Sequence, residues 1–112
     1  MTKRLKAPAH LKPATKAWWL SVQRDFVLEE HNTRLLTLAC EAFDRGEQAR
    51  EVLAADGLVV RDDRRNLRPH PLLVVEKDCR IAFARLVREL GLDVDAPTSA
   101  ARRPPALRGN GG

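Results

Sequence analysis

The sequence has few aromatic residues and few cysteines. Its 112 residues include two tryptophans, three phenylalanines and no tyrosine. The two cysteines, Cys40 and Cys79, fall within helical patterns and have no framework of further cysteines around them. We therefore expect reduced, buried thiols that act as small apolar side chains, with a disulfide as the alternative.

Long apolar runs and catalytic motifs are also missing. No stretch approaches the ~20 apolar residues of a membrane span, and the basic N-terminus lacks the apolar segment of a secretory signal. Neither G-x-x-x-x-G-K-[ST] nor G-x-G-x-x-G occurs, and the three histidines are far apart without metal-ligand spacing. The sequence therefore predicts a protein that is not an enzyme and that needs no cofactor, no metal and no membrane.

Charge is distributed unevenly along the chain, which has a net charge of +5. Cations without any acid occupy residues 1–16 and 96–112, as Lys3, Arg4, Lys6, Lys12, Lys16, Arg102, Arg103 and Arg108. The other 12 basic residues share the middle with all 15 acids, so the middle has a net charge of −3. Basic ends favour a polyanionic partner, with nucleic acid ahead of an acidic membrane surface, and loose terminal charge that aids solubility is the alternative.

Prolines, glycines and apolar spacing predict three helices. Prolines oppose helix in residues 1–13, which we expect to form an extended basic arm. Helices are expected from about 14 to 26, from 30 to 56 with Gly57 as the stop, and from after Pro71 to about 90 with Gly91 as the stop. The apolar stripe of the second helix is Leu35, Leu38, Ala39, Ala42, Phe43, Ala49, Val52 and Leu53. The body is thus mainly α over residues 14–95, and the Pro/Ala/Arg-rich tail, 96–112, is expected to be disordered.

A short β-hairpin is predicted between the second and third helices. Leu58–Val60 is prone to form a strand, the polar residues 62–66 are typical of a turn, and Leu67 and Arg68 can pair back. A plain loop is the alternative. Basic residues in this region and on the third helix are candidate phosphate contacts, and the alternative for them is a solvated face: Arg64, Arg65, Arg68, Lys77 and Arg80.

Two helices carry more apolar surface than one partner covers. Trp18 and Trp19 are adjacent, and neighbours on a helix point about 100° apart. Val74 and Ile81 lie outside the main apolar stripe of the third helix. Self-association would cover this surplus, so these four residues are the predicted oligomer interface.

Four segments carry a resemblance to a known family: "APAHLKPATKAWWLSV", "LLTLACEAFDRGEQAREVLAADGL", "HPLLVVEKDCRIAFARLVRELGLDVDAP" and "RRPPALRGN". Together they resemble the P27 family of phage terminase small subunits. The resemblance implies viral genome packaging, in which the small subunit binds double-stranded viral DNA and delivers it to a large ATPase and nuclease subunit that it regulates. It also implies a ring of small helical protomers, without catalytic residues, in the cytoplasm of the infected bacterial host.

A ring offers an explanation for the paired tryptophans. Trp18 would pack inside the protomer, and Trp19 would face a neighbouring subunit or the long helix, with the reverse assignment as the alternative. Two other functions remain open from the sequence. One is a stand-alone DNA-binding regulator with a helix-turn-helix, and the other is an adaptor protein that does not bind DNA.

Overall fold

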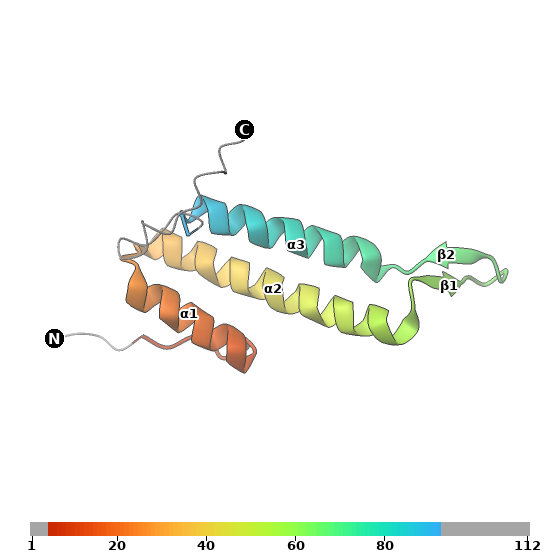
Figure 1. The fold of residues 1–112 in the computed structure, drawn as a ribbon, viewed down its shortest axis with the longest axis horizontal. Helices are drawn as coiled ribbons and strands as arrows, with labels where there is room; N and C mark the ends of the chain where they lie inside the picture. The colour runs from red at the N-terminus through yellow and green to blue at the C-terminus, as the bar shows by residue number, and fades with distance from the viewer. Residues whose placement is uncertain (1–4, 93–112) are drawn as a thin grey trace, which may run out of the picture.

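A computed structural model describes residues 5–92, so Lys3, Arg4, Arg102, Arg103 and Arg108 lie outside the described residues. The elements are α1 (Pro13–Asp25), α2 (Glu30–Asp56), β1 (Val59–Arg61), β2 (Leu67–Pro69) and α3 (Leu72–Glu89) (Figure 1). The predicted fold class, three helices with a hairpin between the second and third, is confirmed.

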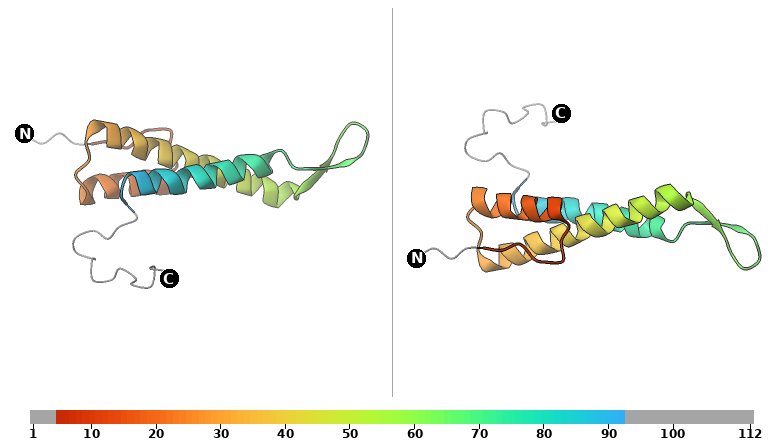
Figure 2. Two further views of the ribbon diagram at one scale, coloured as in Figure 1. Left: turned by 90° about the horizontal axis from the view of Figure 1, so that it is seen from above. Right: turned by 90° about the horizontal axis from the view of Figure 1, so that it is seen from below.

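The long helix α2 is the centre of the fold. Its 27 residues give it a length of about 40 Å. α1 runs antiparallel to the first half of α2, and α3 runs antiparallel along most of its length (Figure 1). Seen from above, α1 and α3 overlap while the start of α2 lies beside them (Figure 2). α2 is therefore covered by two helices, and the hairpin projects beyond both at the far end.

The start of α1 is held by a residue of α2. Pro13 occupies the first turn, where its missing N–H costs nothing, and the N-cap Lys12 makes no side-chain capping bond. Instead, the Asp44 carboxylate accepts a hydrogen bond from the Lys12 backbone N–H at 2.9 Å and another from the Thr15 hydroxyl. A tertiary contact thus replaces the usual local cap and fixes where α1 begins.

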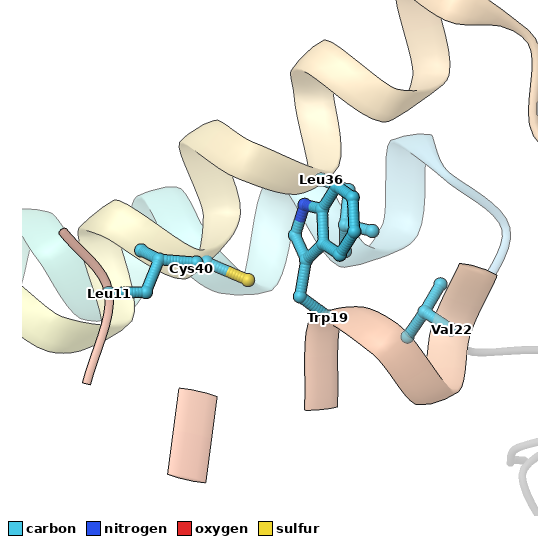
Figure 3. Packing of buried hydrophobic residues seen from close by; sticks show 5 residues of the cluster. All are labelled: Leu11, Trp19, Val22, Leu36 and Cys40. Carbon is cyan, nitrogen blue, oxygen red and sulfur yellow. The ribbon is translucent and has the colours of Figure 1, made fainter. Parts of the chain in front are cut away.

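The core lies between α1 and α2. Trp19, Val22, Leu36 and Cys40 are buried there together with Leu11, which comes from the predicted arm (Figure 3). Burial raises the pKa of the Cys40 thiol to about 12, and both cysteines are free, as the sequence predicts, although Cys79 is only half-buried. The last residues of the arm are therefore part of the packed structure.

The stripe predicted for α2 is only partly correct. Ala39, Ala49 and Leu53 are buried, whereas Leu38 is 51% exposed, and Phe43 and Val52 also lie on the surface. Leu36 and Cys40, which the stripe omitted, are fully buried. The reason is that α2 packs against two helices on two faces, and a single stripe describes only one of them.

The two tryptophans face different neighbours. Trp19 is 4% exposed and its indole N–H donates to the Thr37 hydroxyl of α2 at 3.2 Å. Trp18 is half-buried and its ring centroid lies 5.8 Å from that of Phe83 on α3. The expected interior position is thus taken by Trp19, against the long helix, while Trp18 points towards the third helix. Adjacent tryptophans fit α1 because two helices cover it from two sides.

Close packing and one ionic network join α2 to α3. Gly46 is buried, and a Cβ added there would meet the Cys79 Cβ at 3.3 Å, so the helices approach closely. Nearby, Arg50 of α2 donates to Glu76 of α3 at 2.6 Å, and Arg80 donates to the same carboxylate. Hydrogen bonds from Arg80 and then Arg50 hold the pKa of Glu76 below its usual value.

Candidate nucleic-acid interface

Hydrogen bonds within the turn stabilise the hairpin. Val59 pairs with Pro69 and Arg61 with Leu67 in antiparallel register. The Asp62 carboxylate accepts hydrogen bonds from the backbone N–H groups of Arg64 and Asn66, each at 2.9 Å. An aspartate that binds the backbone of its own turn stabilises the reversal. The predicted hairpin is confirmed, and the loop alternative is not.

A buried histidine anchors the hairpin to the helices. His70 lies between two prolines, and its Nε2 is 3.0 Å from the Asp56 carboxylate at the end of α2. Its Nδ1 accepts a hydrogen bond from the Leu72 backbone N–H at 3.0 Å, at the start of α3. An accepting Nδ1 places the ring proton on Nε2, which donates to Asp56. The sequence analysis did not give His70 this role, because its partner is 14 residues away.

Positive charge collects on the projecting hairpin. From the start of β1 to the end of β2 there are four arginines and two aspartates, which give the hairpin a net charge of +2. Arg68 donates to Asp62 at 3.0 Å, and the Asn66 backbone N–H and then Arg68 hold the pKa of Asp62 below its usual value. Within residues 5–92, no carboxylate forms an ion pair with Arg64 or Arg65. Their exposed guanidinium groups remain available to an anion.

Arg65 has an unusual backbone conformation for an arginine. Its φ is +65°, in the left-handed region that favours glycine and asparagine. Its backbone N–H donates to the Asp62 carbonyl at 2.8 Å, and its carbonyl accepts from Arg61 at 2.8 Å. A non-glycine residue in this region costs about 1–2 kcal/mol.

The other described candidates are dispersed. Lys6 is exposed, Lys16 is half-buried, and the Lys12 Nζ lies 3.7 Å from Glu51 of α2. On α3, Lys77 is exposed and Arg80 is paired with Glu76. The charges of Lys12 and Arg80 are therefore offset by acids. Among the described candidates, the structure brings Arg64, Arg65 and Arg68 together and leaves the rest apart.

The described part of the chain lacks the features of a metal site and of a membrane span. Residues 5–92 contain no group of three or more histidine, cysteine, aspartate or glutamate side chains placed to hold a metal ion. Over the same range, no helix combines the length and the apolar character that a membrane span requires.

Comparison with known families gives one match. A family model described as phage terminase, small subunit, matches residues 16–105. The chain belongs to the phage terminase small subunit family. Curated proteins and solved structures gave no match. Membership supports a role in phage DNA packaging, and the small subunit of a terminase is generally the non-catalytic one. The match does not distinguish the P27 family, which stays a prediction from the quoted motifs.

The range of the family match separates the candidate DNA-contact residues into those inside it and those outside it. It includes α1 from Lys16 onwards, all of α2 and α3, the hairpin arginines, and Arg102 and Arg103 of the tail. It begins after Lys12, so the first four cations lie outside the part that this family shares. Of the described basic residues, those on the hairpin combine family coverage, exposure and clustering.

The helix arrangement differs from a helix-turn-helix. In that motif a short second helix enters the DNA groove. Here α1 is followed by the 27-residue α2, which packs between α1 and α3 (Figure 1). α2 forms the centre of the fold and is poorly placed to enter a groove, so the described helices do not favour the stand-alone regulator.

Proposed function

We propose that the chain binds double-stranded viral DNA and delivers it to the large ATPase and nuclease subunit of a phage terminase, whose activity it regulates. It would act in the cytoplasm of the infected bacterial host. Membership of the small-subunit family supports the packaging role. The single observation that supports DNA contact is the projecting hairpin with its exposed arginines (Figure 1).

The hairpin suits DNA in shape as well as in charge. A two-stranded ribbon fits the major groove, and arginines bind phosphates and guanine edges. The part of the chain between the two basic ends has a net charge of −3, so its helices repel phosphate overall. Contacts from the hairpin, with help from the basic ends, would give an affinity that falls steeply with salt.

We also propose that protomers assemble into a ring through α3. No residue of α3 is fully buried in the single chain, and Val74 and Ile81 are 59% and 46% exposed. Beside Ile81, a hollow of about 670 Å³ is lined by Leu35 of α2 and Leu86 of α3. A second copy packed against this face would bury the apolar surface and repeat the hairpin around the ring. With Trp19 inside the protomer and Trp18 against Phe83, the interface proposal depends mainly on Val74 and Ile81.

The chain on its own is proposed to be non-catalytic. Terminase small subunits are generally the partners that lack the ATPase and nuclease, and this supports the proposal. The purified chain should neither hydrolyse ATP nor cut DNA. It should change the ATPase rate of its cognate large subunit when DNA is present.

The decisive experiment compares salt dependence in two charge-matched variants. R64A/R65A removes the exposed pair from the hairpin, and R24A/R34A removes the same charge far from it, at the end of α1 and the start of α2. Each lost phosphate contact should reduce the slope of log K against log salt by about 0.9, so the hairpin variant should lose about 1.8 per engaged protomer. R24A/R34A should bind like the parent protein. Equal slopes in all three proteins would refute the hairpin as the DNA contact, and a parent protein without salt-dependent DNA binding would favour the adaptor.

A further inference from the structure

A groove runs between α1 and α3 from the last described residue. The two helices meet at Trp18 and Phe83, and there is a hollow on each side of this pair. One hollow, of about 380 Å³, includes Leu92 in its lining, and the other, of about 270 Å³, includes Phe43 of α2. Both are lined by Trp18 and Phe83, so the two hollows adjoin each other, and together they are called the groove. The chain leaves the described structure at one end of it.

The second hollow is lined by aromatic rings from all three helices. Phe83 lies between the other two rings, with centroids 5.8 Å from Trp18 and 5.3 Å from Phe43, both tilted. Ala14 and Thr15 complete the lining. Aromatic grooves of this kind bind proline-rich segments, because the proline ring packs on an aromatic face and the chain is already extended.

The chain itself supplies such a segment beyond Leu92. It continues for 20 residues and contains Pro104 and Pro105. Twelve residue steps separate Leu92 from Pro104, and a random-coil chain of that length would span about 19 Å on average. Phe83 lies nine residues back from Leu92 along α3, which corresponds to about 14 Å. A linker whose average span is close to the required distance gives a high local concentration of the tethered segment.

Family coverage and charge support the same segment. The family match continues 13 residues beyond the last described residue and ends at residue 105, so it includes both prolines. Next to the groove, Asp44 accepts hydrogen bonds from the Lys12 backbone and from Thr15, which lines the groove, and no ion pair within residues 5–92 neutralises its charge. An arginine that flanks the prolines could bind this carboxylate.

We propose that the segment around Pro104 and Pro105 occupies the groove of its own chain, over Trp18, Phe43 and Phe83. The docked prolines shield the Trp18 ring. Arg102, Arg103 and Arg108 are then held along the face between α1 and α3. This interaction goes beyond the proposed function and does not depend on DNA binding.

Cross-linking of the full chain tests the position of the segment. Cys79 is half-buried and lines the hollow of about 130 Å³ that adjoins the groove beside Phe43 and Phe83. A disulfide requires Cα atoms about 4.4–6.8 Å apart, so the new thiol of A106C should bond to Cys79 under mild oxidation. The matched control G111C carries its thiol further along the same tail. Cys40 has no exposed surface and does not compete.

The rates distinguish a docked tail from a free one. In a free chain the two loop lengths differ little, and the intramolecular rates should agree within a factor of about 1.3. Docking should make the intramolecular disulfide form at least about fivefold faster in A106C than in G111C. Equal rates, or a disulfide between two chains in place of the intramolecular one, would overturn the proposal.

Tryptophan fluorescence gives a second measurement. In P104S/P105S, acrylamide should quench the fluorescence of Trp18 more strongly than in the parent chain, because the ring is no longer covered. The Trp18→Phe variant reports Trp19 alone, which is buried with or without the tail. Identical quenching in the parent and P104S/P105S would also refute docking.

Discussion

Asp44→Ala should detach α1 from the rest of the fold. The Asp44 carboxylate accepts hydrogen bonds from the Lys12 backbone and the Thr15 hydroxyl, both of which precede or begin α1. Hydrogen bonds to a charged group contribute about 1.5–3 kcal/mol each. Because these two are only half-buried, we take the lower value, and the variant should lose about 3 kcal/mol from the docking of α1.

The assay uses the position of the tryptophans. Both lie on α1, so their fluorescence reports its docking, while circular dichroism reports all three helices. α2 and α3 keep their own contacts, which include Gly46 against Cys79 and Arg50 with Glu76. In a urea titration of the Asp44→Ala variant, fluorescence should change at a lower concentration than circular dichroism, because α1 undocks first.

A graded control accompanies this variant. Thr15→Val removes one of the two hydrogen bonds and leaves the Lys12 backbone bond, so it should cost about half as much. If fluorescence and circular dichroism of Asp44→Ala change at the same urea concentration, and this is the midpoint of the parent protein, Asp44 does not hold α1. Coincident transitions at a lower midpoint would show that the three helices unfold as one unit.

Two further variants test the α2–α3 contact and the proposed ring. Gly46→Leu should lower the free energy of unfolding by about 1–3 kcal/mol, since the added side chain meets Cys79, whereas Ala55→Leu on the exposed side of α2 should leave it unchanged. Equal urea midpoints for both would contradict the close approach at Gly46. Ile81→Glu should reduce the mass measured by light scattering to that of the 12.6 kDa chain without loss of helix content, whereas Ala55→Glu on the exposed side of α2 should not. If Ile81→Glu keeps the parent mass, Ile81 is not at the interface.

Local signals were sufficient to predict the secondary structure. α2 begins at Glu30 and ends at Asp56 as predicted, because apolar periodicity and Gly57 act within a few residues. The same is true of the hairpin, whose turn is held by Asp62 through contacts at most six residues away. Charge clusters and the family motifs could also be recognised from the sequence alone.

Tertiary structure decided which face of each helix meets which neighbour. Periodicity shows that a helix has an apolar face, but it does not say which other element covers that face, so the sequence could not assign Trp18 and Trp19. The contacts of Asp44 with Lys12, of His10 with Glu41 and of His70 with Asp56 join residues 14 to 32 positions apart. Such pairs form only when packed helices bring distant segments together, because nothing in the local chain specifies the partner.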